Sequence, residues 1–216
     1  MIHYDPHAGG RSAAVIRLAT AAGIPVRSSN TAALATLAAT ARHQGIAAST
    51  EPFPYAELAA VVATHPALLI VADQLQDPHN LGALLRTAAA TGVGGVILPK
   101  DGSVAVTPTV EAAAAGAAAA VPICRVTNLV RTLGMLKESS YWTLGLAPRA
   151  SQDLFALDPP RPVVVVLGGE TGLRSLVASQ CDFLVSIPMF GVVESLNASV
   201  AAAVVLYELR RRWRVA

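Results

Sequence analysis

Three segments of this 216-residue chain combine isolated polar side chains with glycine or proline, each directly after an apolar run. They span residues 73–86, 163–173 and 187–201. Apolar runs of this kind are typical of buried parallel strands, and ligands of such sheets lie beyond the carboxyl ends of the strands. The chemistry of the chain is therefore expected at these three strand exits.

In the first segment, Arg86 stands among alanine, leucine and threonine in a helical pattern. A guanidinium in an apolar helix needs an anionic or polar partner, so Arg86 is a candidate for function. Asp77 and Asn80 are candidate helix caps, and Asn80 lies nearly two turns from Arg86, so the two need not touch. His79 has no second ligand at metal-binding spacing, and we interpret it as a turn residue.

The second segment places Gly168, Gly169 and Gly172 after a run of valines. Glycine permits positive φ and a close backbone approach, so amides and carbonyls here could bind an adenosine group. The pattern is not GxGxxG, no acidic residue follows about twenty positions later, and the chain has no GK[ST] phosphate loop. A glycine-rich turn with Glu170 as a helix cap is the structural alternative.

The third segment leads into an alanine-rich helix for which Ser195 is a candidate cap. Asn197 offers both a donor and an acceptor at an apolar helix start. Either a structural hydrogen-bond network or a ligand hydroxyl must satisfy it.

The elements that would position these residues form an α/β fold. Six continuous apolar runs predict strands covered on both faces, hence a mostly parallel sheet with flanking helices. The runs are residues 67–72, 95–98, 121–126, 141–145, 163–167 and 183–187.

A smaller αβαβ piece is expected before this sheet. Helical spacing predicts helices over 12–22 and 31–42, the second capped by Ser29 or Asn30, and short strands over 24–27 and 46–49. Residues 50–54 read as a linker, and a helix is expected over 55–64.

Composition excludes some classes of protein. A chain with 53% hydrophobic and 14% charged residues is not disordered. No apolar run reaches 18 residues, and the first residues lack the pattern of a signal peptide, so we expect no membrane association. Two cysteines without a CxxC motif favour the cytoplasm. Fourteen of the 16 basic residues are arginine, which suits phosphate binding but also follows from mutational bias.

Taken together, the stretches 80–86, 168–173 and 187–189 with 195–200 resemble the three motifs of the SpoU/TrmH class of SPOUT RNA methyltransferases. The resemblance covers about residues 67 to 213. The stretch Arg125-Val-Thr-Asn-Leu is most similar to the branch that methylates a guanosine ribose in large-subunit ribosomal RNA. One departure is that the family's second motif usually has one more residue between the glutamate and the next glycine than Glu170-Thr-Gly172 has.

The resemblance implies a C-terminal trefoil knot, a homodimer, S-adenosylmethionine as cofactor, an RNA substrate and no metal. It also implies a partial RNA-binding domain over residues 1–49, similar to the family around His43-Gln-Gly45 and shortened at its start. A linker and lead-in helix over 50–65 and a SPOUT catalytic domain over 66–216 would follow.

The resemblance also assigns site residues. The catalytic candidates are Arg86, Asn80, Glu170, Ser195 and Asn197. The donor-binding candidates are Leu167, Gly168, Gly169, Gly172, Ile187, Met189, Ser195 and Leu196. Contacts to RNA are expected from arginines of the small domain, namely Arg11, Arg17, Arg27 and Arg42, although a solvated face explains each of these equally well.

Methyl transfer to a ribose hydroxyl needs alignment and activation of a weakly acidic oxygen. By resemblance, Arg86 supplies the activation. Because arginine stays charged, we expect it to stabilise the developing alkoxide or to anchor the adjacent phosphate rather than to act as a base. Asn80 would position Arg86 or the ribose.

Three alternatives remain open from the sequence. A tRNA ribose methyltransferase would share every catalytic residue. A non-catalytic RNA-binding relative would be marked by the shortened second motif. A nicotinamide-dependent oxidoreductase would rest on the glycines of 168–172 alone.

Overall fold

The computed structural model describes residues 1–9, 11–38 and 43–213, and the chain divides into two compact units, Met1–Pro52 and Phe53–Ala216. The division falls inside the proline-containing stretch 50–54, which the sequence predicts to be a linker. Each unit is described by itself.

The first unit is a three-stranded sheet with two helices. The strand order is β2-β1-β3, with β1 parallel to β2 and antiparallel to β3. Its elements are β1 (Ile2–Tyr4), α1 (Arg11–Ala21), β2 (Val26–Ser28), α2 (Thr31–Ala38) and β3 (Ile46–Ala48).

The expected αβαβ order omitted the central strand of this unit. Three residues are too few to display the two-residue period of a strand, so β1 left no signal in the sequence. Asn30 rather than Ser29 caps α2, because its Oδ1 accepts from the amide of Ala33 at 2.8 Å. Residues 39–42, expected to end this helix, lie outside the described residues.

The second unit contains a seven-stranded sheet in which every described pairing is parallel. The strand order is β6-β5-β4-β9-β7-β10-β8. The strands are β4 (Leu68–Asp73), β5 (Val96–Pro99), β6 (Ile123–Val126), β7 (Trp142–Leu146), β8 (Gln152–Asp153), β9 (Val163–Gly168) and β10 (Phe183–Ser186). All six predicted strands are present. The two-residue strand β8 was missed because it is polar and very short.

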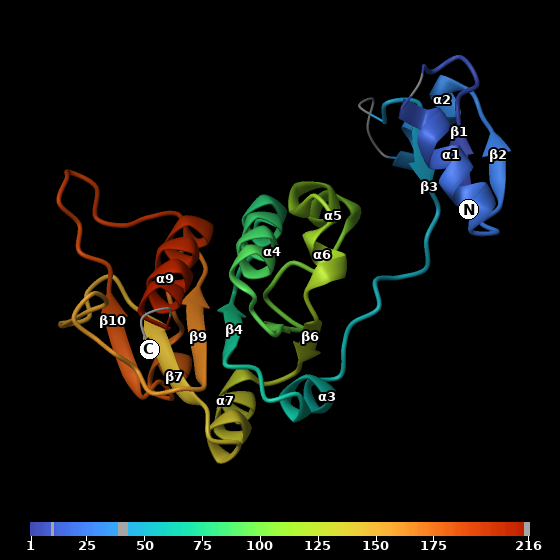
Figure 1. The fold of residues 1–216 in the computed structure, drawn as a ribbon. Helices are drawn as coiled ribbons and strands as arrows, with labels where there is room; N and C mark the ends of the chain where they lie inside the picture. The colour runs from blue at the N-terminus through green and yellow to red at the C-terminus, as the bar shows by residue number, and fades with distance from the viewer. Residues whose placement is uncertain (10, 39–42, 214–216) are drawn as a thin grey trace. The chain divides into compact units, whose positions relative to one another are not determined.

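Helices cover both faces of this sheet, as the sequence predicted (Figure 1). One face carries α4 (Pro78–Thr91), α5 (Pro108–Ala114), α6 (Ala117–Ala120) and α9 (Ala198–Trp213). The other carries α3 (Leu58–Ala63), α7 (Leu129–Glu138) and α8 (Ser175–Ala178). The central strands are buried on both sides, since Ile70 of β4 packs toward α4 and its neighbour Val71 packs toward α7.

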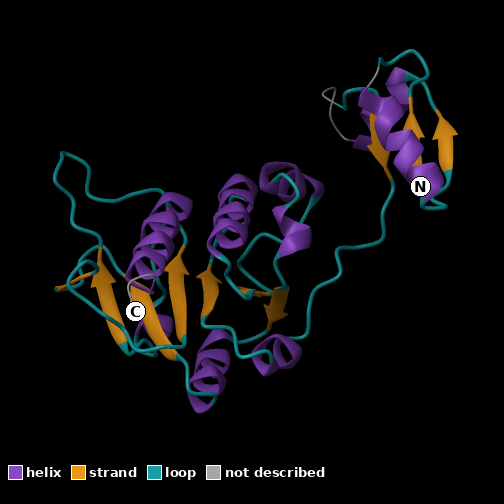
Figure 2. Cartoon of the chain, viewed as in Figure 1, coloured by secondary structure: helices purple, strands orange, loops and turns teal. Residues whose placement is uncertain are grey.

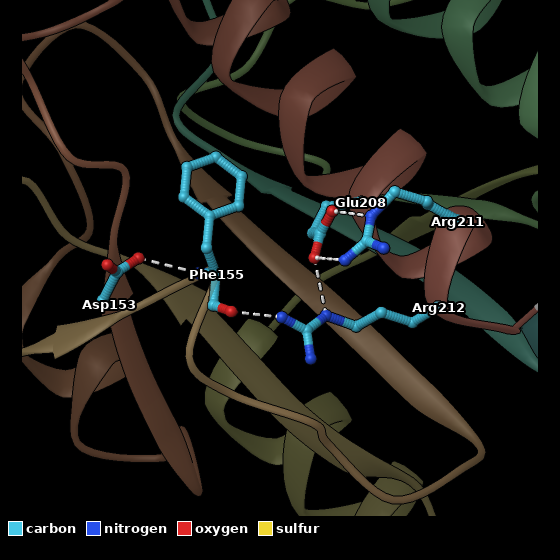
Figure 3. Close-up of polar contacts among 5 residues, drawn as sticks. All are labelled: Asp153, Phe155, Glu208, Arg211 and Arg212. Atoms are coloured by element: carbon cyan, nitrogen blue, oxygen red, sulfur yellow. Dashed lines mark hydrogen bonds and ion pairs between the residues drawn. The ribbon is translucent and has the colours of Figure 1, made fainter. Parts of the chain in front are cut away.

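The end of α9 is tied to the segment after β8 by a buried carboxylate (Figure 3). Glu208 is only 8% exposed and accepts from Nε of Arg211 at 2.8 Å and Nε of Arg212 at 2.7 Å. Arg212 also donates to the carbonyl of Phe155. The hydrogen bonds from Arg211 and then Arg212 lower the pKa of Glu208, so its charged form stabilises this contact.

Candidate functional site

The three strand exits that the sequence singled out meet around one cavity. Its volume is about 470 Å³, and it lies at the carboxyl ends of β7 and β9 and the first turns of α4 and α9. The lining residues are Asn80, Leu146, Pro148, Leu167, Gly168, Gly169, Glu170, Thr171, Gly172, Ser195, Leu196, Asn197, Ala198 and Ala201. We call this the donor cavity, after the donor-binding candidates of the sequence analysis that are among its lining residues.

The glycine loop after β9 forms one wall of the donor cavity. The amide of Gly172 donates to the carbonyl of Gly169 at 3.0 Å, and Gly172 has φ +79°, so the loop closes as a tight turn. The amide of Gly169 donates to the carbonyl of Asp73 at 2.8 Å. A Cβ on Gly169 would lie 2.2 Å from the carbonyl oxygen of Gln74, so only glycine allows this contact between the two exits.

An ion pair between a buried carboxylate and a half-exposed arginine fixes the far end of this loop. The side chain of Asp73, at the end of β4, is fully buried and accepts from the amide and Nε of Arg174 at 3.0 and 2.8 Å. Nη2 of Arg174 lies 2.7 Å from the same carboxylate. The sequence analysis missed this pair, although a carboxylate at the end of a wholly apolar run was a signal that it needed a partner.

The first and third exits are joined by two asparagines. Nδ2 of Asn197 donates to Oδ1 of Asn80 at 2.8 Å, and Asn80 is 8% exposed. Oδ1 of Asn197 accepts from the amide of Ser199 at 2.9 Å, and its carbonyl accepts from the amide of Ala201. Asn197 therefore caps α9, and the expectation that Ser195 does so was wrong.

The cap of α4 is Asp77, whose carboxylate accepts from the amide of His79 at 2.9 Å. Asn80 is consequently inside the helix, where its side chain is free to pair with Asn197. His79, interpreted from the sequence as a turn residue, lies instead in the first turn of helix α4.

A smaller, more apolar cavity of about 60 Å³ adjoins the donor cavity and shares five lining residues with it, including Ser195 and Leu196. Ile187 and Met189, which follow β10, line this smaller cavity. Every donor-binding candidate thus lines one of the two cavities. Figure 2 shows that the segment from β10 to α9, which supplies several of them, is loop throughout.

Glu170 and Ser195 line the donor cavity and are exposed. Neither has a hydrogen bond to another residue in the described part of the chain. Their polar atoms are therefore open to a ligand.

Arg86 lies apart from the other catalytic candidates. It is exposed on α4, and its side chain has no ion pair or hydrogen bond with the residues that the structure describes, so the anionic or polar partner expected from the sequence is absent there. Six helical residues displace it about 9 Å along the axis and roughly 120° around it from Asn80. Its guanidinium is thus presented to solvent, where a large substrate can reach it.

The two cysteines are not candidate nucleophiles. Burial raises the pKa of Cys124 to about 11 and that of Cys181 to about 12, so both thiols stay protonated. Among the described residues, no group of three or more histidine, cysteine or acidic side chains could hold a metal ion. Within residues 1–9, 11–38 and 43–213, every helix is too short or too polar to span a lipid bilayer.

Two of the four arginines expected to contact RNA can be placed. Arg17 and Arg27 are exposed in the first unit. Arg42 and the side chain of Arg11 lie outside what the structure describes.

The two units match two family models. Residues 67–207 match the SpoU rRNA Methylase family, and residues 2–56 match the RNA 2′-O ribose methyltransferase substrate-binding family. The chain is 46% identical over 202 residues to the 23S rRNA (guanosine-2′-O-)-methyltransferase RlmB of Ralstonia nicotianae, covering 91% of this chain and 81% of that one.

Solved structures show the same architecture. The SpoU methyltransferase AviRb from Streptomyces viridochromogenes, in complex with AdoMet, has a TM-score of 0.84 at 24% identity, covering 100% of this chain and 83% of that one. An AdoMet-bound rRNA methyltransferase from Sinorhizobium meliloti has a TM-score of 0.75 at 25% identity, with 98% and 79% coverage.

Proposed function

The chain belongs to the SpoU rRNA methylase family of S-adenosylmethionine-dependent RNA ribose 2′-O-methyltransferases, and we propose that its target is a guanosine ribose in large-subunit ribosomal RNA. The observation that carries the proposal is the meeting of three distant segments around one cavity, joined by the hydrogen bond between Asn80 and Asn197. The 46% identity to a guanosine-2′-O-methyltransferase favours guanosine. The matched relatives come from bacteria, in which ribosomal RNA is cytoplasmic, and on this ground we propose a cytoplasmic location.

The residues of the donor cavity fit S-adenosylmethionine. A cavity of about 470 Å³ is within the range of roughly 300–1,000 Å³ that holds a nucleoside-sized ligand. Leu146, Leu167 and Leu196 offer apolar surface for an adenine ring. Backbone groups at Gly168 and Gly169 offer hydrogen bonds, and the carboxylate of Glu170 complements a positively charged sulfonium.

We assign the roles as follows. The backbone at Leu167, Gly168, Gly169, Gly172, Ile187, Met189 and Leu196, with Ser195, holds the donor. When bound, S-adenosylmethionine supplies the methyl group, which passes from sulfur to the 2′-oxygen as that hydroxyl loses its proton. The protein's first task is alignment, which can lower the barrier by about 7–11 kcal/mol when orientation is ideal.

Arg86 performs the second task. Its exposed guanidinium stabilises negative charge that develops on the 2′-oxygen or binds the adjacent phosphate. Asn80 does not orient Arg86 directly, because six helical residues place the two on different sides of α4. Its task is to hold the start of α9 against α4 through its hydrogen bond with Asn197. Glu170, Ser195 and Asn197 provide the polar surface around the reacting groups.

A trefoil knot is the arrangement that we infer for the C-terminal part. β10 lies between β7 and β8, which are joined by only residues 147–151. The amide of Ala147 donates to the carbonyl of Val185, and the amide of Leu154 donates to that of Ser186. The connection thus crosses the exit of β10, and threading of residues 187–197 beneath it would complete the knot.

A homodimer is the second part of the proposal about architecture. Phe190 and Val192, in the loop before α9, are 95% and fully exposed, and Tyr207 on α9 is 57% exposed. Exposed large apolar side chains of this kind favour a protein partner. Sedimentation analysis at micromolar concentration should give twice the mass of one chain.

The test of the target is ribose-methylation mapping in ribosomal and transfer RNA of the host with and without the gene. We expect one guanosine of large-subunit ribosomal RNA to lose its methyl group, and purified protein with S-adenosylmethionine to restore it. Loss of a tRNA methyl group instead would select the tRNA alternative. Absence of transfer to any RNA, with S-adenosylmethionine unbound in calorimetry, would select the non-catalytic relative.

A further inference from the structure

A separate cavity of about 550 Å³, which we call the basic cavity, lies at the carboxyl ends of β5 and β6. It shares no lining residue with the donor cavity. Its walls come from the start of the second unit, the exits of the two strands and the first turns of α7. The lining residues are Tyr55, Ala56, Glu57, Leu58, Lys100, Arg125, Val126, Thr127, Asn128, Arg131, Thr132 and Met135.

The charges in this cavity are mainly positive. Lys100, Arg125 and Arg131 line it against one carboxylate, that of Glu57. None of the three cations has an ion pair with a residue in the described ranges. The amino-terminal end of α7 adds a partial positive charge on the same side.

Arg125 is held in place before any ligand arrives. Its guanidinium carbon lies 5.4 Å from the ring centroid of Tyr55, and Nη2 donates to the carbonyl of Lys100. The Tyr55 hydroxyl in turn accepts from the amide of Val106 at 2.8 Å, which fixes the ring. Nε of Arg125 is buried without a partner in the described residues. A guanidinium immobilised in this way loses little further entropy on binding.

From these observations we propose that this cavity binds the phosphate backbone of the RNA substrate. The bound phosphates belong to the part of the RNA strand that extends from the methylated nucleotide toward β6. The proposal rests on the proposed function and adds a position for the substrate. Arginine and lysine side chains with a single opposing carboxylate are suited to bind phosphate oxygens. A metal ion would need more carboxylates, and an apolar ligand would need a cavity with fewer charges.

The distance between the two cavities suits a single RNA strand. Both lie at the same edge of one parallel sheet, since β5, β6, β7 and β9 run in the same direction. The strand order puts about three strand spacings between them, or roughly 14 Å. A single RNA strand of a few nucleotides can span a separation of this size.

The test measures RNA affinity against salt for Arg131→Gln, for Lys100→Gln/Arg131→Gln and for the control Lys137→Gln. Lys137 is at the opposite end of α7, outside the cavity, and pairs with Asp182 at 2.8 Å. The probe is unmodified large-subunit ribosomal RNA transcribed in vitro. All three substitutions replace exposed or half-buried side chains, and melting curves confirm that each variant is folded.

For each phosphate contact removed, we expect the salt slope to fall by about 0.7 and the Kd near 0.1 M salt to rise about fivefold. The double variant should therefore bind about 25-fold more weakly, with an RNA KM raised in parallel and S-adenosylmethionine affinity within about twofold of wild type. Lys137→Gln should keep the wild-type slope.

An unchanged slope in the double variant would overturn the cavity as a phosphate site, and so would an equal loss in Lys137→Gln, which would reflect net charge alone. These outcomes differ from failure of the proposed function. If the wild-type protein transfers no methyl group to RNA, the function fails, while the slopes still decide whether the cavity binds RNA.

Discussion

At the scale of single residues, the pair Asn80 and Asn197 links two helices by their amides. Each asparagine can both donate and accept, and the geometry uses this fully at Asn197, which donates to Asn80 and accepts from Ser199. An uncharged pair of this kind can hold the start of α9 without adding charge beside the positively charged methyl donor, S-adenosylmethionine.

Asn197→Ala should remove both S-adenosylmethionine binding and methyl transfer. Oδ1 of the buried Asn80 would lose its donor and α9 its cap, at a cost of about 1–3 kcal/mol in unfolding free energy. Calorimetry with the donor and a transfer assay measure the two effects. Ser179→Ala, an exposed serine at the end of α8, is the control. Unchanged turnover in Asn197→Ala would remove this residue from the site.

Arg86→Ala should lower methyl transfer by about 100-fold or more while leaving donor affinity nearly intact. The reason is that Arg86 lies outside the donor cavity, whereas its proposed role is on the substrate oxygen or phosphate. Transfer of labelled methyl groups and calorimetry report the two quantities separately. Parallel loss of donor affinity would contradict the assignment, and Arg86→Lys tests whether charge alone suffices.

At the scale of elements, the exits of β4 and β9 are fastened to each other. The backbone bond from Gly169 to Asp73 holds one end of the glycine loop, and the ion pair from Arg174 to Asp73 holds the other. A loop closed at both ends keeps its amides in a fixed direction, which favours binding by lowering the entropy lost.

Asp73→Asn should loosen this loop. The fully buried carboxylate would lose its charge opposite Arg174, whose half-exposed side chain can rehydrate, so we expect a loss of about 1–3 kcal/mol in unfolding free energy. S-adenosylmethionine should bind about tenfold more weakly. Urea unfolding and calorimetry measure these changes. The exposed Asp101, which follows β5, gives the control Asp101→Asn, and equal effects from both variants would refute the role of Asp73.

The Glu208 contact, in which Arg212 bridges Glu208 of α9 and the segment after β8, predicts that the stability of the protein depends on pH. The pKa of Glu208 is held below its ordinary value of 4.5, chiefly by Arg211, so its contribution is complete above that value and is lost as pH falls through the lowered pKa. Glu208→Gln should reduce the unfolding free energy by about 1–3 kcal/mol at pH 7.

Denaturant unfolding at pH 7 and near pH 3.5 tests this prediction. The difference between wild type and Glu208→Gln should shrink at the lower pH, because below the ordinary pKa of 4.5 the unfolded chain binds a proton at Glu208 more readily than the folded chain does. If the difference in unfolding free energy between wild type and Glu208→Gln is the same at both pH values, the charge of Glu208 does not stabilise this contact.

At the scale of the whole molecule, the chain separates into two units with their own sheets. All residues of the donor cavity belong to the second unit, and so do those of the basic cavity. The first unit, which matches the substrate-binding family model, carries the exposed Arg17 and Arg27.

Removal of residues 1–52 should leave a folded protein that binds S-adenosylmethionine with unchanged affinity. RNA affinity should fall by at least about tenfold, because phosphate contacts of the first unit are lost. Circular dichroism, calorimetry and an RNA-binding assay measure fold, donor binding and substrate binding in turn. Full RNA affinity in the shortened chain would exclude the first unit from substrate binding.

Much of the second unit could be predicted because its strands are continuous apolar runs covered on both faces. Elements of two or three residues, such as β1 and β8, could not be predicted, since so few residues cannot display the two-residue period of a strand. The cap of α9 was misplaced because Ser195 and Asn197 both have capping side chains and only the path of the chain selects one.

The sequence by itself determined the parallel α/β architecture and the three segments of the site, because hydrophobic period and glycine position are local properties of the chain. Tertiary structure alone decided which polar groups meet. Asp73 pairs with Arg174 across 101 positions and Asn80 with Asn197 across 117, whereas Arg86, six residues from Asn80, faces solvent. Such partners depend on strand order and helix rotation, which are set by packing of the entire core.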